Sequence, residues 1–445
     1  LILFLGVLMG ALDIAIVGPA LPSIGRRFDV DARALAWVFT IYVLFNLIGT
    51  PLIARLSDQY GRRQLYVLSV GLFAAGSLLV AVTPTFSLLL VGRAVQGFGA
   101  GGVFPIATAV IGDTFPPEIR GRALGMLGAV FGLAFLVGPI LGGVLLRYGW
   151  AWLFLINLPL AAGGIASSLR VLPAGVAPRS TRFDLAGVVL LSAGLAALAL
   201  GISAIDAEQW ARSLAAPSVW PLLLVAVVLL GVFWRLEGRA PAPLIDPSVL
   251  GNRQLGIANA LSAISGLVEA GIVFVPSLIV TAFAVEPSAA SFLLLPAVLA
   301  MAVGAPVTGR MLDRHGSRLV VLGGSAVLGV GLALVRWTTA SLPAFIANGI
   351  VIGVGLSSLI GAPLRYIVLN EADEEYRAAA QAVTTLFRSI GRMVGGVLLG
   401  AVIASHAGGS LAGYHTAFLL LAAVVIAGWI LALGLKGREA ERRTA

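Results

Sequence analysis

Five charged side chains stand inside long apolar stretches of this sequence: Asp13, Arg93, Glu269, Arg388 and Arg392. Moving a charge to the middle of a bilayer costs at least ~2.5 kcal/mol, so such residues need a partner or a function. Desolvation favours the neutral form of a carboxylic acid, whereas a nearby cation favours the charged form. An acid that meets an arginine in only one conformation would therefore bind and release a proton as the protein changes shape.

The sequence around these charges is typical of an integral membrane protein. Of its 445 residues, 59% are hydrophobic and 11% are charged, and the mean hydropathy is +1.02. Soluble domains do not reach such values. Because a bilayer core takes about 20 apolar residues per helix, we predict an all-α membrane protein with 14 spans, at residues 1–24, 34–57, 64–83, 86–112, 121–147, 150–172, 183–205, 217–235, 254–283, 288–312, 317–338, 341–368, 376–405 and 412–435.

The residue types argue against several classes of function. There is no cysteine, and three scattered histidines (His315, His406 and His415) do not suggest a metal site. We find no nucleophile triad and no phosphate-binding glycine loop, so we expect neither an enzyme nor a cofactor. The proton gradient is then the expected source of energy. The net charge is +9, but the positive residues are distributed over many loops rather than gathered in one patch. This distribution argues against nucleic acid as a partner.

Positive charge is unequally divided between the two sets of alternate loops. The loops assigned to the cytoplasm hold Arg55, Arg62, Arg63, Arg120, Arg122, Arg170, Arg179, Arg182, Arg235, Arg239, Arg253, Arg310, Arg314, Arg318, Arg365, Arg377 and the tail "KGREAERR". The opposite loops hold mainly Arg26, Arg27, Arg33, Arg147, Arg212 and Arg336. Since cytoplasmic loops carry an excess of Lys and Arg, we expect both termini in the cytoplasm.

One short hydrophilic phrase occurs twice. "ARLSDQYGRR" at residues 54–63 matches "GRMLDRHGSR" at 309–318, which places Asp313 255 residues after Asp58, and "GGVLL" at 142–146 recurs at 395–399. These two offsets indicate an internal duplication. The excess length predicts an inserted helix pair between the halves. We therefore expect a six-helix bundle at 1–172, two linker helices within 173–240, a second six-helix bundle at 241–435 and a cytoplasmic tail at 436–445.

Several motifs together resemble the major facilitator superfamily, and specifically its 14-helix drug:proton antiporter group. The first phrase is similar to the signature between helices two and three, with Ala54 where the pattern has glycine. "VGRAVQGFGAGG" at 91–102 resembles the fourth-helix motif, and "GLAFLVGPILGG" at 132–143 resembles the fifth-helix antiporter motif. "LDIAIVGPALPSI" at 12–24 and "WAWLFLINLP" at 150–159 resemble segments of the 14-helix branch. This resemblance implies proton coupling through the acid of the first helix, Asp13, and the arginine of the fourth, Arg93.

The first phrase also has a physical interpretation of its own. An aspartate and arginines beside helix ends can form charge-assisted hydrogen bonds that hold two helices together. We predict such a cytoplasmic gate from Asp58, Gly61, Arg62, Arg63, Asp113, Arg120 and Asp313. The alternative is a solvated loop that sets only the topology.

The fifth-helix motif is rich in small residues. Gly138, Pro139, Gly142 and Gly143 remove side chains and one backbone donor from a helix face, which allows close contact with another helix and a bend. The motif is interpreted either as a conformational element or as ordinary small-residue packing. Its second copy keeps Gly395 and Gly396 but lacks the Gly-Pro pair.

The two acids occupy nearly equivalent places in the duplication. Adding 255 to 13 gives 268, one residue from Glu269, so we expect both acids to face a central cavity where the halves meet. Glu269 is interpreted as a second proton site, as a counter-ion for a cationic substrate, or as a structural partner of Arg388 or Arg392. These two arginines, one turn apart, could instead bind an anionic headgroup. Tyr42 and Asn46 complete the predicted substrate cavity.

These features predict a proton-coupled antiporter that exports amphipathic, cationic or neutral compounds by alternating access. An exporter of lipids or lipid-linked molecules with the same fold is the alternative, and a receptor or scaffold is a third class that the buried charges argue against. Expected partners are protons, membrane lipid and amphipathic small molecules. We expect a monomer in a bacterial cytoplasmic membrane.

Overall fold

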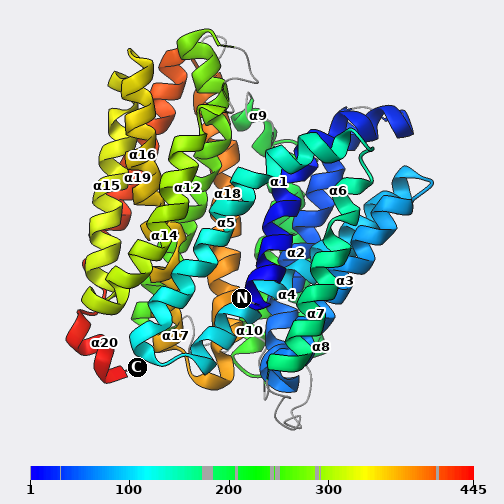
Figure 1. Cartoon of the computed structure of the whole chain (residues 1–445), viewed down its shortest axis with the longest axis vertical. Coiled ribbons are helices and arrows are strands. Elements are labelled where there is room, and N and C mark those ends of the chain that lie inside the picture. The colour runs from blue at the N-terminus through cyan, green and yellow to red at the C-terminus, as the bar shows by residue number, and fades with distance from the viewer. Residues whose placement is uncertain are drawn as a thin grey trace.

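The computed structural model describes residues 2–30, 32–172, 184–205, 209–240, 245, 251–285, 290, 292–406 and 410–444. Over these residues the regular structure is helical (Figure 1). Apolar side chains fill most of the helix-helix contacts, as the composition requires. We call the end of the molecule that carries the two repeated phrases the cytoplasmic end, following the charge asymmetry.

The N-terminal helices form one side of the molecule. They are α1 (Ile2–Phe28), α2 (Ala32–Tyr60), α3 (Arg62–Val82), α4 (Phe86–Thr114), α5 (Pro117–Leu146), α6 (Trp152–Leu155) and α7 (Asn157–Val171). Helix α4 packs against both α2 and α3, while α1 packs against α5 and α7. A buried cluster that includes Tyr66, Phe73 and Leu127 begins within this side and continues to Leu312 and Tyr366 of the C-terminal helices.

The C-terminal helices form the other side, on the left in Figure 1. They are α12 (Arg253–Phe283), α14 (Leu295–His315), α15 (Ser317–Thr338), α16 (Leu342–Ile360), α17 (Ala362–Glu371), the short 3₁₀ helix η1 (Glu374–Tyr376), α18 (Arg377–Ala404), α19 (Leu411–Ala432) and α20 (Arg438–Thr444). Helix α12 packs on α18 and α19, and α16 packs on α14 and α15.

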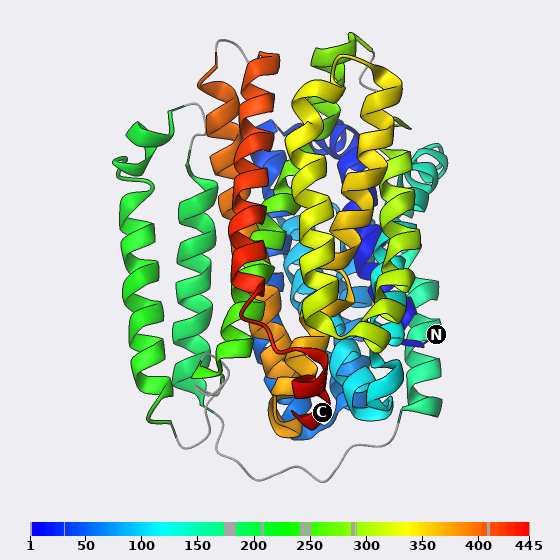
Figure 2. The same cartoon turned by 90° about the vertical axis from the view of Figure 1, so that its left-hand side faces the viewer.

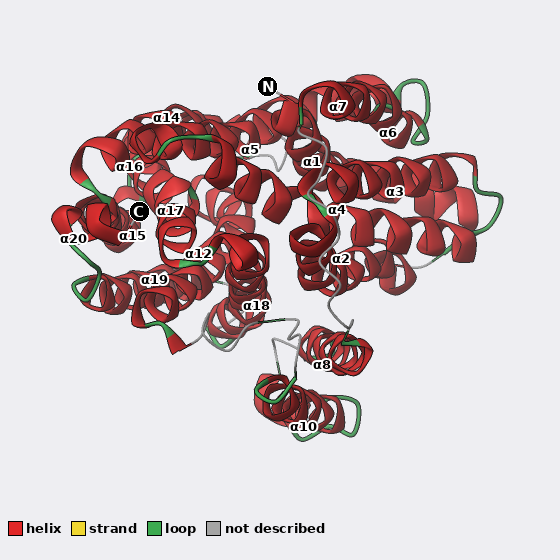
Figure 3. Ribbon diagram, turned by 90° about the horizontal axis from the view of Figure 1, so that it is seen from below, coloured by secondary structure: helices red, strands yellow, loops and turns green. Residues whose placement is uncertain are grey.

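Two further helices stand outside both groups. Helix α8 (Leu185–Ser203) contacts α2 and α18, whereas α10 (Trp220–Glu237) packs mainly on α8, and the short α9 (Trp210–Leu214) lies between them in sequence. Figures 2 and 3 show this pair at the edge of the molecule. The inserted unit at 173–240 stays a prediction, and its residues 173–183 and 206–208 lie outside the described residues.

Eleven helices of the described chain are long and apolar enough to cross a membrane. The other three predicted spans coincide with α1, α5 and α8. The prediction of a multi-pass helical membrane protein is therefore confirmed, while the count of 14 spans stays a prediction. One predicted span, 341–368, is divided at Gly361 into α16 and α17, because Pro363 has no N–H to donate back to the carbonyl of Leu359.

The repeated phrase is not the loop that the sequence suggested. Helix α2 ends at Tyr60 and α3 begins at Arg62, so Gly61 alone separates them, and Gly316 alone separates α14 from α15. Both glycines have positive φ, +101° and +81°. A residue with a side chain rarely adopts this backbone conformation, which explains why each copy of the phrase carries a glycine here.

Two helix pairs join the N-terminal and C-terminal sides at the cytoplasmic end. In the α5–α14 pair, a Cβ on Gly309 would lie 2.4 Å from the carbonyl oxygen of Gly121, so the two backbones touch. In the α2–α18 pair, Ala54 packs in a buried alanine cluster with Ala378 and Ala382. Ala54 and Gly309 hold equivalent places in the two phrases. Each phrase thus supplies a small residue where helices of opposite sides meet.

We predict that Gly309→Ala destabilises the protein, because the new methyl group must push α5 and α14 apart. Overpacking of this kind costs about 1–3 kcal/mol. The measurement is the unfolding midpoint of the purified protein in neutral detergent. Gly323→Ala is the matched control, since a Cβ on Gly323 meets nothing within 4 Å and alanine favours the helix. Equal midpoints for the two variants would contradict this account of the helix contact.

Candidate functional site: two buried charge networks and a closed end

The predicted pair Asp13 and Arg93 is present and fully enclosed. Arg93 Nη1 donates to Asp13 Oδ2 at 2.8 Å, and the two residues are 1% and 0% exposed. Gln96 Nε2 donates to the other carboxylate oxygen, Oδ1, also at 2.8 Å. Arg93 Nη1 donates in addition to Gln96 Oε1 at 2.5 Å. Both carboxylate oxygens of Asp13 are therefore hydrogen-bonded within the N-terminal side.

The network extends through polar side chains that the sequence analysis did not include in the site. Gln96 Nε2 also donates to Ser77 Oγ at 2.8 Å, and Asn157 Nδ2 donates to the same oxygen at 3.3 Å. All three residues are completely buried. The sequence marks these residues only as polar residues inside apolar spans. A single serine or asparagine is common in such spans, so this feature alone does not assign a residue to the site.

Arg93 has contacts besides the acid. Its Nε donates to the carbonyl oxygen of Val38 at 3.1 Å. Its guanidinium carbon lies 4.2 Å from the ring centre of Tyr42 and 5.8 Å from that of Phe154, on α6. Tyr42 is buried and contacts this network through its ring, while its place in the substrate cavity stays a prediction. Asn46, one turn further along α2, is half-buried.

Close helix packing brings the network together. Arg93 and Gln96 are three residues apart and so lie on one face of α4. Beside them, a Cβ on Gly97 would lie 2.2 Å from the carbonyl oxygen of Tyr42, and one on Gly76 would lie 2.5 Å from the backbone nitrogen of Gln96. The glycines therefore let α4 approach α2 and α3 closely, which carries the side chains of α4 to α1.

The second set of mid-span charges lies within the C-terminal side. Glu269 on α12 is 3.3 Å from Arg392 Nε and 3.8 Å from Arg388 Nη1, both on α18. These ion pairs are longer than the 2.8 Å pair of Asp13 and Arg93. Among the described residues no hydrogen bond or ion pair joins Glu269 to Asp13, and each acid is paired on its own side. Of the three interpretations of Glu269, pairing with the two arginines is what the geometry shows.

A third arginine, Arg365, belongs beside this set, although the sequence analysis assigned it to a cytoplasmic loop. It stands in the first turn of α17, is 4% exposed, and interacts electrostatically with Glu269 and Arg388. Its guanidinium carbon lies 4.0 Å from the ring centre of Phe104 on α4, across from the C-terminal side. The assignment was wrong because a positive charge near a helix end fits the charge bias whether it is in solvent or buried.

The predicted gate residues around the first phrase bring the two sides together. Asp58 accepts hydrogen bonds from the backbone N–H groups of Ala378 (3.3 Å) and Ala379 (3.0 Å), at the beginning of α18. It also pairs with Arg62. Arg62 Nε reaches Asp113 Oδ2 at 3.1 Å, and Arg377 Nη1 reaches Asp113 Oδ1 at 2.9 Å. A chain of opposite charges therefore crosses between α2, α4 and α18.

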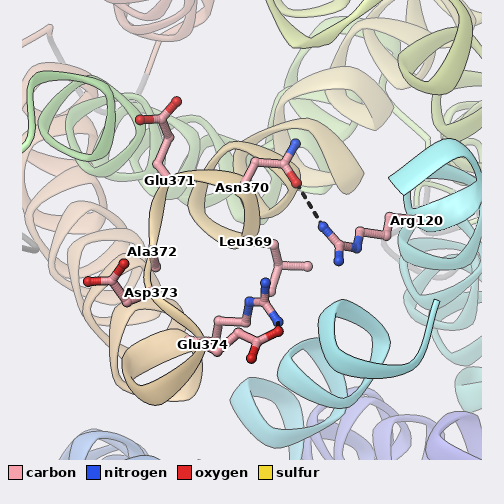
Figure 4. Close-up of a pocket in the computed structure, with 8 residues that line it drawn as sticks. Arg120, Leu369, Asn370, Glu371, Ala372, Asp373 and Glu374 are labelled. Atoms are coloured by element: carbon pink, nitrogen blue, oxygen red, sulfur yellow. Dashed lines mark hydrogen bonds and ion pairs between the residues drawn. The ribbon is translucent and has the colours of Figure 1, made fainter. Parts of the chain in front are cut away.

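The second phrase forms the mirror contact. Asp313 accepts from the backbone N–H groups of Gly121 (2.8 Å) and Arg122 (3.0 Å), at the beginning of α5. Arg120 Nη1 donates to Asn370 Oδ1 at 3.2 Å across a pocket of about 340 Å³ between α5 and the α17–α18 connection (Figure 4). Arg63 lies in the first turn of α3 with intermediate exposure. The cytoplasmic end is therefore closed by two related contacts.

Two arginines that were assigned to cytoplasmic loops take part in this closed end. Arg55 is 3% exposed and lies over the ring of Tyr376, with 4.9 Å between its guanidinium carbon and the ring centre. Arg377, 8% exposed, pairs with Asp113 as described. Both residues are parts of helices or helix ends rather than of solvated loops.

The tail is folded against the second phrase. Glu441 of α20 accepts from the backbone N–H of Ser317 (3.2 and 3.1 Å to its two oxygens) and from the Ser317 hydroxyl. Lys436 Nζ lies 2.6 Å from Glu371 Oε1. Burial raises the pKa of the Glu441 carboxyl above its ordinary value, so docking of this segment is favoured as the pH falls.

The fifth-helix motif lies within α5, which runs without interruption from Pro117 to Leu146. Gly138 and Gly142 are buried. The burial of Pro139 and Gly143 is not among the features that the structure describes. Helix α5 packs on α1 as well as on α14, so small residues on α5 serve contacts on two sides. A bend at the Gly-Pro pair stays a prediction.

Known proteins of similar sequence and structure are transporters. The profile of the Major Facilitator Superfamily matches residues 3–234 and 257–445. The uncharacterized MFS-type transporter YfiU of Bacillus subtilis is 34% identical over 87% of this chain and 76% of its own. Multidrug resistance protein 3 of the same organism is 28% identical over 90% of this chain and 78% of its own. Multidrug resistance protein Stp of Mycobacterium tuberculosis is 29% identical over 90% of this chain and 74% of its own.

A solved structure has the same fold. The crystal structure of the human organic anion transporter MFSD10 (TETRAN) aligns with 97% of this chain and 98% of that chain, with a TM-score of 0.72 and 19% sequence identity. The profile match over most of the chain, the identity to YfiU and this fold lead to one conclusion. The chain is a multi-pass membrane protein that belongs to the major facilitator superfamily.

Proposed function

We propose that this protein exports amphipathic small molecules in exchange for protons, by alternating access. The observation that carries the proposal is the enclosed pair of Asp13 and Arg93, with Gln96 on the second carboxylate oxygen. Relatives named multidrug resistance proteins support export as the direction and amphipathic compounds as the cargo. The 14-helix antiporter group remains the expected subgroup.

Proton coupling follows from what happens when α1 and α4 separate. A buried carboxylate that loses both hydrogen-bond donors and its counter-ion binds a proton, because the charged form is then neither solvated nor paired. Arg93 keeps other partners in that state, namely the carbonyl oxygen of Val38 and the ring face of Tyr42. The arginine is thus held in place while the acid changes its charge, which is what a proton carrier coupled to a conformational change needs.

The cytoplasmic contacts supply the two-state element. Asp58 binds the first N–H groups of α18, where the helix dipole favours a negative charge, and Asp313 binds N–H groups in the second turn of α5, each on the opposite side of the molecule. These bonds exist only when the cytoplasmic ends of the two sides meet. They therefore stabilise a cytoplasm-closed state, and a cytoplasm-open state requires that they break.

A second candidate function is export of a lipid or lipid-linked molecule. The observation that favours it is Arg392, whose side chain is 46% exposed in the middle of α18, next to Arg388. A lipid headgroup retained by the protein purified in neutral detergent would favour this candidate. Release of every lipid on purification, together with transport of soluble amphiphiles, would favour the first.

We predict that Asp13→Asn abolishes proton-coupled transport, because an amide can neither bind nor release the transported proton. The assay uses liposomes with a pH dye inside and a panel of amphiphiles outside, from tetraphenylphosphonium to decyl phosphate. Wild type should change the internal pH with at least one of them, and Asp13→Asn should reduce the rate at least tenfold, or about 1.4 kcal/mol.

Asp29→Asn is the matched control, because Asp29 is an exposed carboxylate just beyond the same helix with φ of +51°, a conformation that asparagine tolerates. It should transport like wild type. Wild-type liposomes that never change their internal pH with any amphiphile would overturn the proposed function. Full activity of Asp13→Asn would remove Asp13 from the proton path.

We predict that Asp58→Asn opens the cytoplasmic end, since the charge that binds Arg62 and the start of α18 is lost. Losing charge-assisted hydrogen bonds of this kind shifts an equilibrium by about 1.5–3 kcal/mol, roughly ten- to a hundredfold. The measurement is the distance between spin labels at Gln64→Cys and His315→Cys, exposed positions on the two sides. The sequence has no cysteine, so no other site is labelled.

The label distance should increase in Asp58→Asn, while the distance between labels at Val82→Cys and Trp337→Cys, at the opposite end, should decrease. Asp373→Asn, an exposed acid near the same contact, should leave both distances unchanged. If the distributions of Asp58→Asn and wild type coincide, the Asp58 contact does not stabilise the closed state.

A further inference from the structure

The charge set of the C-terminal side is unlike that of the N-terminal side in one respect: its positive charges exceed its negative charges. Two guanidinium groups, those of Arg388 and Arg392, pair with one carboxylate, that of Glu269, and the buried Arg365 interacts electrostatically with the same carboxylate. In a bilayer, unpaired charge is costly. A protein that keeps an excess of arginines at this depth has a use for them that Glu269 alone does not satisfy.

The guanidinium groups also have unused hydrogen-bonding capacity. Arg365 is 4% exposed, yet its Nη1 has no acceptor within the described part of the chain. Within the described residues, the ion pairs of Glu269 have distances of 3.3 and 3.8 Å, longer than a good charge-assisted hydrogen bond of about 2.7–2.9 Å. By contrast, both carboxylate oxygens of Asp13 are bound at 2.8 Å. The C-terminal set is loosely held and incomplete.

The broken helix beside the set explains how it is positioned. The division between α16 and α17 frees carbonyl groups at the end of α16, and Arg388 Nη2 donates to one of them, the oxygen of Ile360, at 3.0 Å. Arg365 stands in the first turn of α17, at the end of a helix that favours negative charge. Discontinuous helices near the bilayer midplane commonly form substrate sites in transporters.

The set faces the N-terminal side of the molecule. Helix α18, which carries Arg388 and Arg392, packs on α2, and the guanidinium carbon of Arg365 lies 4.0 Å from the ring centre of Phe104 on α4. A ligand between the two sides would meet the half-exposed Arg392 first. Separation of α4 from α17, as the cytoplasmic end opens, would then uncover Arg365.

We propose that Arg365, Arg388 and Arg392 form a binding site for the acidic headgroup of an amphipathic substrate, a phosphate, sulfonate or carboxylate. The inference rests on the proposed function and narrows it, since it replaces the expected cationic or neutral cargo by an anionic one. Glu269 is the counter-ion that the headgroup displaces. The site is more complete when the cytoplasmic end is open, because Phe104 then leaves Arg365, so the anion is bound on the cytoplasmic side and released on the other.

The first experiment compares probes with one tail and different heads: decyl phosphate and decyltrimethylammonium, each titrated into purified protein in neutral detergent. Because the same probe is compared between variants, partitioning into the detergent cancels. Arg388→Gln and Arg392→Gln should each weaken decyl phosphate binding about tenfold or more, and Arg388→Lys should restore part of the loss. Arg336→Gln is the matched control, because Arg336 is an exposed arginine in the last turn of α15, at the end of that helix opposite the repeated phrase. This variant should bind like wild type.

Glu269→Gln separates the anionic from the cationic interpretation. If the site binds anions, removing the competing carboxylate should tighten decyl phosphate binding several-fold. If decyltrimethylammonium binds better than decyl phosphate and Glu269→Gln abolishes that binding, the site binds cations and the proposal is overturned. Unchanged decyl phosphate binding in both Arg388→Gln and Arg392→Gln would overturn it as well.

The role of Arg365 is tested in the opened protein. Asp58→Asn should bind decyl phosphate more tightly than wild type does, and adding Arg365→Gln should remove that gain. A gain that persists without the Arg365 guanidinium would remove this residue from the site. Unfolding midpoints of all variants, measured in parallel, show whether each is folded.

Two further readouts distinguish the sources of the headgroup and the two levels of the proposal. Phosphatidylglycerol retained in native mass spectrometry by wild type, and lost in Arg388→Gln, identifies a lipid; decyl phosphate binding without retained phosphatidylglycerol identifies a free amphiphile. If wild type binds decyl phosphate but shows no proton-coupled transport, the anion site stands and the proposed function is overturned. If wild type transports tetraphenylphosphonium with proton coupling but does not bind decyl phosphate, the proposed function stands and the anion site is overturned.

Discussion

A charge within the hydrocarbon layer must find its counter-charge and its hydrogen bonds inside the protein, and the arrangement of this molecule follows from how each of its two sides meets that requirement. The N-terminal side meets it completely, with Asp13 bound by Arg93 and Gln96. The C-terminal side meets it in part, with Glu269 among three arginines. A complete pair suits a switch that changes its own charge, and an incomplete set suits a site for a charge that arrives from outside.

The duplication shows how this difference arose between equivalent helices. The position 255 residues after Arg93 is Asn348, a buried residue whose Nδ2 donates to the carbonyl oxygen of Gly331. The acid of the first helix is kept as Glu269, so its cationic partner has to come from another helix. That partner is Arg392, which stands 253 residues after Pro139 of the fifth-helix motif. The arginines that pair with Glu269 thus stand on the fifth helix of the C-terminal side, whereas the arginine that pairs with Asp13 stands on the fourth helix of the N-terminal side.

Much of the fold and part of the site could be predicted from the sequence. Long apolar runs predict spans directly, and Asp13 and Arg93 stand out because a charge in such a run is rare. Arg365, Arg377 and Arg55 were misplaced because the excess of arginine near cytoplasmic helix ends is the same for a solvated side chain and for a buried one. The depth of each arginine is set by what packs over it, here Phe104, Asp113 and Tyr376, and those contacts are distant in sequence.

For the repeated phrase, the sequence predicted the residues of the contact but not their partners. Its residues predicted a gate, and both copies do bind the start of a helix on the opposite side. The partners are backbone N–H groups of Ala379 and Gly121, which no side-chain pattern reveals. Because the donors are backbone groups, the contact requires close approach of two helices, and the small residues Ala54 and Gly309 one turn earlier allow it. The phrase is therefore a packing motif and an electrostatic motif at once, which is why it needs a small residue, an aspartate and a glycine in a fixed order.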